Sequence, residues 1–310
     1  MRVAVIDCGT NTFNLLVVDT RDGNFSWVHS AKIPVKLGEG GINRGFIASL
    51  PFSRGIEALI QYSKILAEKN VERVFAFATS AIRDASNGAE FVEEARLKSG
   101  ILIEVINGDR EAELIYKGNR LALDLGETPC LIMDIGGGST EFIIGNRTEI
   151  LWKKSYQLGA ARLLEAFKPS NPLTEAEKGR INSFLFDSLY DLARAVEIYK
   201  PVELIGSSGA FDSIVEMIHG ELNGEPFYKD KPEYRVDLKH YFAVADRVIS
   251  STVEERRKMK GLVEMRVDMM VISCLLMNYV LNNFALSRLR VSTYSLKEGA
   301  LYELMYNHII

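Results

Sequence analysis

Two short segments of the chain carry residue types that bind phosphate. Each starts with an aspartate at the end of an apolar run and turns through small residues into a second apolar run: Asp7-Cys8-Gly9-Thr10-Asn11-Thr12 and Asp134-Ile135-Gly136-Gly137-Gly138-Ser139-Thr140-Glu141. A strand that leads into a turn of small residues leaves backbone N–H groups unpaired and directed into one space, and such a concavity binds anions, phosphate above all. We therefore expect two phosphate-binding half-sites that face each other across a cleft.

The two aspartates are candidates for holding a divalent cation, Mg²⁺ or another. A carboxylate at a strand end can hold such an ion through water against a phosphate bound in the adjacent turn. Asp134 is the stronger candidate, because a carboxylate at the end of an apolar strand is costly unless a partner or an ion satisfies it. For Asp7 a purely structural role, in which the carboxylate caps the N–H groups of its own turn, is a real alternative.

The composition bounds the class of protein. The residues are 47% hydrophobic and 25% charged, which is ordinary for a globular protein. A chain of 310 residues is too long for a single hydrophobic core, so we expect two domains. The net charge is −4, whereas a duplex-binding surface is typically basic, so nucleic acid is not the expected partner. A protein of this balance that binds phosphate must concentrate its positive charge locally.

The cysteines and the apolar runs indicate the compartment. Cys8, Cys130 and Cys274 lack CxxC spacing, and we expect small buried hydrophobes in a reducing compartment, not disulfides or zinc ligands. A strand-like run begins directly at Arg2 with no signal-peptide pattern. The longest apolar stretch, 269–281, is shorter than the roughly 20 residues of a membrane span. We expect a buried helix there and a cytoplasmic protein with no membrane partner.

The apolar patterning predicts two mixed α/β halves that each begin strand–turn–strand. The break at Gly126-Glu127-Thr128-Pro129 places the domains at 1–125 and 126–310, with a last helix, 296–310, that can pack back on the first domain. The predicted strands are 3–6, 15–19, 26–33, 73–78, 102–106, 130–133, 141–144, 150–155, 202–205 and 290–292. The predicted helices are 51–70, 90–98, 111–123, 160–167, a long one from the capped start at Thr174 to Tyr199, one after Gly209, 261–284 and 296–306.

Several motifs together resemble the exopolyphosphatase/guanosine pentaphosphate phosphatase family of the sugar kinase–actin–heat-shock ATPase superfamily. They are DCGTNTFNLL (7–16), ATSAIR (78–83), GDREA (108–112), DIGGGSTE (134–141), QLGAARL (157–163), GSSGAF (206–211), RVDM (266–269) and VSTYSLKEGALY (291–302). The resemblance covers nearly the whole chain and matches the family's short, two-domain form. It implies two actin-like (ribonuclease H-like) domains with mixed sheets flanked by helices, an active site in the interdomain cleft, and a homodimer.

The resemblance places the catalytic glutamate at Glu111. A carboxylate in a cleft can accept a proton from an attacking water, although a glutamate in the first turn of a helix is also favoured by the dipole alone. Arg83 can clamp a phosphate bidentately, or it can form an ion pair with Asp84 or another nearby acid. Glu141 is a second acid expected in the same space, to orient water or assist the metal. Relatives often carry an acidic residue where this chain has Arg110.

The expected phosphate donors lie in the two turns, and other segments can line the substrate. Thr10, Asn11 and Thr12 keep the hydroxyl donors of the Gly-Ser-Asn-Ser common in relatives, and they face Gly136, Gly137, Gly138 and Ser139. Gly206-Ser207-Ser208-Gly209 resembles the superfamily loop that packs against a nucleoside base, and whether a nucleotide binds there is left open. Two basic segments, 256–260 and Lys32, Lys36 and Arg44 around the 38–41 turn, can contact a polyanion, although charge runs are usually solvated faces.

The resemblance favours an enzyme that releases terminal orthophosphate from inorganic polyphosphate by Mg²⁺-assisted attack of water on a phosphoric anhydride bond. The alternatives are a guanosine pentaphosphate (pppGpp) phosphohydrolase and a weakly catalytic alarmone- or nucleotide-binding sensor. The presence of both Glu111 and Glu141 argues against the sensor. A kinase or ATPase would call for a sugar pocket or a chaperone-type peptide domain, and the sequence shows neither.

Overall fold

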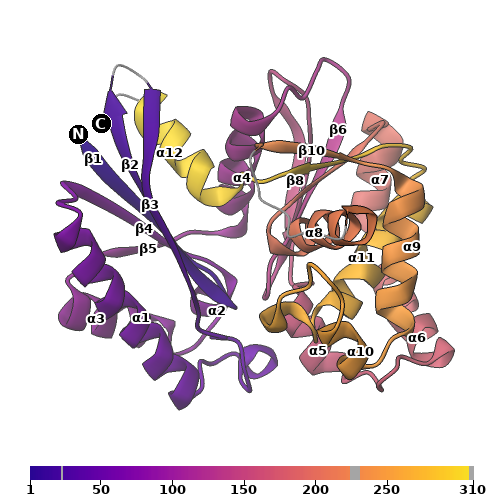
Figure 1. Ribbon diagram of the computed structural model, residues 1–310, viewed down its shortest axis with the longest axis horizontal. Helices are drawn as coiled ribbons and strands as arrows, with labels where there is room; N and C mark the ends of the chain where they lie inside the picture. The colour runs from indigo at the N-terminus through magenta and orange to yellow at the C-terminus, as the bar shows by residue number, and fades with distance from the viewer. Residues whose placement is uncertain (22–23, 224–230, 307–310) are drawn as a thin grey trace.

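The protein forms two lobes, each built around one mixed β-sheet (Figure 1). The computed structural model describes residues 1–21, 24–223 and 231–306. The first sheet has the strand order β3-β2-β1-β4-β5, and the second has the order β10-β11-β9-β6-β7-β8. In both, the first strand of the lobe pairs antiparallel with the next strand along the chain and parallel with the fourth. The expected pair of mixed sheets flanked by helices is confirmed.

The first lobe buries a stripe of apolar side chains from α1 and α3 against its sheet. Ile56, Leu59, Tyr62 and Leu66 recur on one face of α1 and are buried, as helical spacing requires, and α1 and α3 cover one face of the sheet in Figure 1. The elements are β1 (Arg2–Cys8), β2 (Thr12–Arg21), β3 (Asn24–Pro34), η1 (Ile42–Arg44), α1 (Ser49–Glu68), β4 (Arg73–Ala78), α2 (Ser80–Arg83), α3 (Gly88–Ser99), β5 (Ile103–Val105) and α4 (Gly108–Ala122).

The second lobe repeats the arrangement with more helices on its outer face. Its elements are β6 (Cys130–Ile135), β7 (Thr140–Gly145), β8 (Ile150–Tyr156), α5 (Ala160–Phe167), α6 (Glu175–Ser188), α7 (Tyr190–Tyr199), β9 (Leu204–Ser207), α8 (Gly209–Asn223), β10 (Glu233–Val236), α9 (Leu238–Ser250), α10 (Val253–Arg257), η2 (Glu264–Arg266), α11 (Met270–Asn283), β11 (Leu289–Ser292) and α12 (Leu296–Tyr306). The predicted capping box at Thr174 is confirmed, since Thr174 and Glu177 bond reciprocally.

Two predicted helices differ in the structure. The single helix expected from Thr174 to Tyr199 is two helices, α6 and α7, which meet at the non-helical Leu189. Leu189 is buried in the core of this lobe, and apolar spacing alone does not distinguish such a bend from a continuous helix. The helix expected from 261 begins only at Met270. Gly261 has φ +84° and lies so close to the backbone of Glu216 that a Cβ would come within 2.4 Å of it, so Gly261 forms a turn against α8.

The elements β10 and α9 were not among those predicted, and neither were the short helices α2, α10, η1 and η2. β10 is a short strand that pairs antiparallel with β11 at the edge of the second sheet. Asp237 caps α9, because its side chain accepts a hydrogen bond from the Lys239 backbone N–H at 2.8 Å, and this N-cap signal is present in the sequence. Positions 22 and 23, between β2 and β3, lie outside the described residues.

Helices α4 and α12 lie between the two sheets (Figure 1). α4 packs on β7 and β8 of the second lobe, and α12 packs on α4 and on β1 of the first. Their apolar side chains join those of both sheets in one core cluster that includes Val5, Ile115, Ile132 and Leu301. The 125/126 boundary stays a prediction, because each sequence half contributes its last helix to this shared layer.

Cys8, Cys130 and Cys274 are buried and free, as expected. Within the described ranges, no helix combines the length and the apolar character that crossing a membrane requires.

Candidate active site

The two predicted phosphate-binding turns have the same backbone geometry. The Gly9 N–H donates to the Thr12 carbonyl at 3.2 Å, and the Gly136 N–H donates to the Ser139 carbonyl at 3.0 Å. In both turns two carbonyls accept hydrogen bonds from a segment that comes after the third strand of the lobe. Those of Thr10 and Asn11 accept from residues 35–38, and those of Gly136 and Gly137 accept from residues 160–162. Within the described chain, no acceptor pairs with the N–H of Asn11 or Gly137. Each turn therefore keeps backbone donors for an anion.

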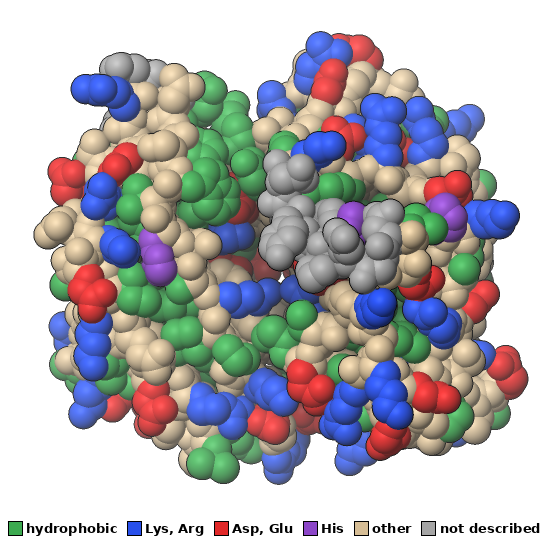
Figure 2. Space-filling view, in the orientation of Figure 1, with side chains coloured by type: hydrophobic (Ala, Val, Ile, Leu, Met, Phe, Trp, Pro, Cys, Tyr) green, Lys and Arg blue, Asp and Glu red, His purple; other side chains and the backbone are tan. Residues whose placement is uncertain are grey.

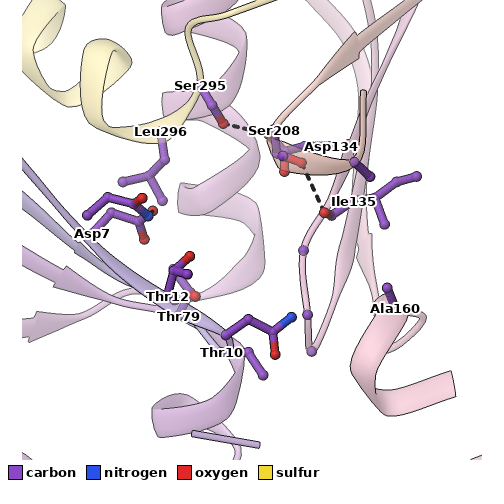
Figure 3. Close-up of a pocket in the computed structure, with 18 of the residues that line it drawn as sticks. Asp7, Thr10, Thr12, Thr79, Asp134, Ile135, Ala160, Ser208, Ser295 and Leu296 are labelled. Carbon is purple, nitrogen blue, oxygen red and sulfur yellow. Dashed lines mark hydrogen bonds between the residues drawn. The ribbon is translucent and has the colours of Figure 1, made fainter. Parts of the chain in front are cut away.

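The two turns lie directly against each other. A Cβ on Gly137 would come within 2.4 Å of Asn11 Nδ2, and a Cβ on Gly138 within 2.7 Å of Thr10 Oγ1. Figure 3 shows Asp7, Thr10 and Thr12 on one side of the pocket and Asp134, Ile135 and Ala160 on the other. The glycines of 136–138 are thus required for the close approach of the two lobes as well as for the turn.

One cavity brings together most of the predicted site residues. Those that line it are Asp7, Thr10, Asn11, Thr12, Glu111, Asp134, Gly136, Gly137, Gly138, Ser139, Ser208 and Gly209. They come from β1, β2, α4 and β6, from the two turns, and from the start of α8. The cavity thus places Glu111 in the same space as both turns, as the expected reaction requires.

Glu111 and Glu141 form a pair of buried carboxylates beside Arg83. Glu111 is 7% exposed and Glu141 is 1% exposed, and Arg83 Nη1 donates to Glu111 Oε2 at 2.8 Å. Burial, and then repulsion by Glu141, raise the pKa of Glu111 well above its ordinary value, although Arg83 opposes the shift. Burial also raises the pKa of Glu141 to about 7, with the charge of Asp134 adding to it.

Arg83 forms ion pairs with two acids. Its Nε also lies 3.3 Å from Asp84 Oδ1, and its Nη1 donates to the Ile106 carbonyl at 3.2 Å. The ion-pair alternative for Arg83 is therefore what the structure shows, with Glu111 as the closer partner. A role in holding phosphate stays a prediction.

The two aspartates occupy matching positions, but their partners differ. Asp134 Oδ2 accepts hydrogen bonds from the hydroxyls of Ser207 and Ser295, while Asp7 Oδ2 accepts one from Asn14 Nδ2 at 3.0 Å. Asp7 therefore binds its cross-strand neighbour and not the N–H groups of its own turn. Burial raises the pKa of Asp7 to about 6 and also raises the pKa of Asp134.

The donor set fits a magnesium ion that takes some of its oxygen ligands from a bound phosphate. Among residues 1–21, 24–223 and 231–306, no group of three or more His, Cys, Asp or Glu side chains is placed to hold a metal. Mg²⁺ commonly uses one or two carboxylates and completes its shell with water and substrate phosphates. Asp7 and Asp134 line the same cavity, together with Glu111 and Asp212, and the charge of Asp134 acts on Asp7.

Some predicted residues lie outside the cavity. Arg83 and Glu141 do not line it, although both lie beside Glu111, and Lys36 is exposed and does not line it either. Ser207 acts on the site only through Asp134. Gly206 serves packing, because a Cβ there would overlap the ring of Phe211. In the basic run 256–260, Arg256 is buried and donates to the Val267 carbonyl at 3.0 Å, so it holds a loop.

Other residues of the cavity were not singled out from the sequence. The main ones are Asn14, Asp212, Arg266, Ser295 and Lys297. Lys32, which belongs to a predicted basic segment, lines the cavity with them, and Figure 2 shows Lys and Arg side chains in the hollow between the lobes. Hairpin pairing was a usable signal for Asn14, since β1 and β2 place it opposite Asp7. Arg266, Ser295 and Lys297 lie within quoted motifs, but only the folded chain brings them to the first lobe.

Met269 also departs from expectation. The methionines and leucines of 269–281 were expected to be core, and Met270 to Leu281 are buried with the exception of Asn278. Met269, however, lines the cavity, where its sulfur accepts a hydrogen bond from Asn11 Nδ2 at 3.0 Å.

Comparison with known proteins agrees with this geometry. The profile of the Ppx/GppA phosphatase family matches residues 16–308. A putative exopolyphosphatase of Haemophilus influenzae is 26% identical over 306 residues, which cover 98% of this chain and 92% of that protein. Exopolyphosphatase 2 of Mycobacterium tuberculosis is 34% identical over 223 residues, or 69% of each chain.

Solved structures show the same fold. A crystal structure of an exopolyphosphatase from Cytophaga hutchinsonii is 37% identical and gives a TM-score of 0.96, covering 99% of this chain and 98% of that one. The Aquifex aeolicus member of the Ppx/GppA family is 28% identical and gives a TM-score of 0.81, with coverages of 99% and 98%.

The fold and the site together define a phosphatase, a hydrolase of the actin-like ATPase superfamily. More closely, the chain belongs to the Ppx/GppA phosphatase family.

Proposed function

We propose that the protein is an exopolyphosphatase, which removes the terminal orthophosphate of inorganic polyphosphate. The observation that carries the proposal is the position of Glu111, a buried carboxylate held at 2.8 Å by Arg83 in the same cavity as two turns with unpaired backbone donors. The names of the relatives in Cytophaga and Mycobacterium support the same substrate.

The geometry suggests how the chain's own residues perform the reaction. The turn at Gly136–Ser139 and the turn at Thr10–Thr12 hold the terminal phosphate between them and neutralise its oxygens. Glu111 orients a water molecule and accepts its proton as the water oxygen bonds to the terminal phosphorus. The bond from that phosphorus to the bridging oxygen breaks, which yields orthophosphate and a chain shorter by one phosphate. A Mg²⁺ ion held by Asp7 and Asp134 would supply charge neutralisation at the phosphate oxygens.

A guanosine pentaphosphate phosphohydrolase is the second candidate, and one observation favours it. The cavity continues into an outer groove that shares Lys32 and Lys297 with it and is also lined by Trp27 and Tyr294. The two rings lie 6.1 Å apart, and Trp27 is 49% exposed. An exposed indole can stack on a nucleobase, so the groove suits a nucleoside as well as a polyanion.

Phosphate release from purified protein tests the proposal. We expect release from long-chain polyphosphate that depends on Mg²⁺, and Glu111→Gln should lower kcat by about 10²-fold or more while substrate still binds. Preferred release from pppGpp would favour the second candidate. Binding of a nucleotide with no release from any substrate would favour a sensor. Unchanged turnover in Glu111→Gln would remove Glu111 from the role of base.

A cytoplasmic location and a homodimer remain predictions that accompany this function. Sedimentation of the purified protein tests the dimer.

A further inference from the structure

The side chain of Arg162 joins the two lobes beside the cavity. It comes from α5 of the second lobe and is 9% exposed. Its Nε donates to the carbonyl of Gly138 in the glycine turn at 2.8 Å. Its other two nitrogens donate across to the first lobe, Nη1 to the Ile42 carbonyl at 3.1 Å and Nη2 to Asp84 Oδ2 at 3.1 Å. One guanidinium thus holds acceptors from both lobes.

Asp84 is the acceptor that Arg162 shares with Arg83. Arg83 Nε lies 3.3 Å from Asp84 Oδ1, and Arg83 Nη1 donates to Glu111 at 2.8 Å. The carboxylate of Asp84 is also held by the hydroxyl of Ser80 at 2.9 Å. A continuous chain of polar contacts therefore runs from the glycine turn through Arg162, Asp84 and Arg83 to Glu111.

The bond to the Gly138 carbonyl acts on the phosphate donors themselves. In a trans peptide the C=O and the following N–H point in opposite directions. By fixing the Gly138 carbonyl, Arg162 Nε fixes the direction of the Ser139 N–H. The Arg162 backbone N–H does the same for the preceding peptide, whose N–H belongs to Gly138, through the Gly137 carbonyl at 3.0 Å. Ser139 and Gly138 both line the cavity.

We propose that Arg162 and Asp84 are positioning residues, which set the glycine turn of the second lobe against Arg83 and Glu111 of the first. The proposal rests on the proposed function for its kinetic consequence. The planar guanidinium suits the task because it holds several acceptors in one fixed geometry, which an ammonium group does not. Without Asp84, the buried guanidinium of Arg162 loses its carboxylate partner, and without Arg162, the Asp84 carboxylate keeps only Arg83 as an ion-pair partner.

Kinetics of matched variants test the proposal. Arg162→Met should lower kcat/KM by about tenfold or more at a temperature where the protein is fully folded, and Arg162→Lys should recover only part of the loss. The double variant Arg162→Met/Asp84→Asn should be no worse than the poorer single variant, because the two residues act as one pair. Rates within about twofold of wild type for Arg162→Met, or additive losses, would overturn it.

Arg2→Met is the matched control. Arg2 also forms a two-point ion pair, with Asp19 at 2.8 Å, and also donates to a carbonyl, that of Lys69 at 2.7 Å. It lies inside the first lobe at the far end of β1 from Asp7. Its loss should change stability and leave kcat/KM unchanged.

A spin-label distance across the cleft tests the pair without turnover. Cysteines at Leu50 and Phe186, which are 76% and 66% exposed, would carry the labels, since the native cysteines are buried. The distance distribution should broaden in Arg162→Met and not in Arg2→Met; an unchanged distribution contradicts the proposal. Wild-type protein that releases no phosphate would defeat the proposed function, while the label result would still decide the role of the pair.

Discussion

At the scale of single residues, the site is defined by carboxylates that are difficult to ionise. Glu111, Glu141, Asp7 and Asp134 all have raised pKa values, each mainly because of burial. Arg83 touches only Glu111 among these four, and its charge opposes the shift at both Glu111 and Glu141. Glu111, the proposed base, must be deprotonated before it can accept a proton from water. The rate should therefore rise with pH on the acid side.

The pH profile of Glu141→Gln tests this coupling. The charge of Glu141 is the second largest cause, after burial, of the raised pKa of Glu111. Replacing it with an amide, which still accepts from Ser155, should lower the pKa of Glu111. The acid limb of kcat/KM should therefore move to lower pH, whatever happens to its height. The exposed Glu104→Gln serves as control, and a limb that stays in place would show that the two carboxylates do not titrate together.

At the scale of elements, the layer between the lobes depends on two glycines. Helices α4 and α12 approach so closely that a Cβ on Gly299 would lie 1.7 Å from the Leu114 carbonyl oxygen, and one on Gly118 would lie 2.1 Å from that of Ser295. No side chain fits at either position without separating the helices. Because α4 begins with the turn that carries Glu111, the spacing of this layer also sets the position of the proposed base.

Gly299→Ala should therefore destabilise the protein. Forcing a methyl group into a packed helix contact costs about 1–3 kcal/mol, and denaturant unfolding measures it. Gly179→Ala in α6 is the matched control, since its Cβ would meet nothing within 4 Å. That change should stabilise the protein by about 0.5–1 kcal/mol, as alanine does in an open helix position. Equal effects of the two substitutions would contradict the close contact seen between α4 and α12.

Arg110 belongs to the same layer. This arginine pairs with Glu303 of α12 at 2.9 Å. Its charge is therefore directed at the helix contact, one residue before Glu111 in the chain.

At the scale of the whole molecule, the fold concentrates opposite charges around one cavity in a chain of net charge −4. Its acids Glu111 and Asp134 are buried, and the cations Lys32, Arg266 and Lys297 line the same space. This arrangement makes the stability of the protein depend on pH. The folded state holds protons on Asp7 and Glu141 more tightly than the unfolded chain does, because burial raises their pKa values to about 6 and about 7.

The free energy of unfolding should contain a contribution from these two groups that is complete below about pH 4 and is lost as the pH rises through 6 and 7. The loss is up to about 3 kcal/mol for each group, since one pKa unit corresponds to about 1.4 kcal/mol. Asp7→Asn combined with Glu141→Gln should flatten the stability between pH 5 and pH 8 relative to wild type, as measured by urea unfolding. The exposed Glu57→Gln should keep the wild-type slope, and a double variant with that same slope would contradict the assignment.

The sequence by itself determined the repeated turn, most of the strands and helices, and the family. These depend on local signals: an aspartate after an apolar run, glycines where a turn leaves no room for a side chain, and apolar residues at strand or helix spacing. It also supplied Glu111, Asp7, Asp134 and the two turns, because each lies in a contiguous motif.

Only the tertiary structure decided how those motifs meet. Lys297, Ser295 and Arg266 reach the cavity from the end of the chain, Lys36 lies outside it, and Arg162 connects Gly138 to Asp84 across the lobes. The physical reason is that these contacts join residues far apart in the chain, and their geometry follows from how two sheets pack on α4 and α12. No spacing along the sequence encodes that packing.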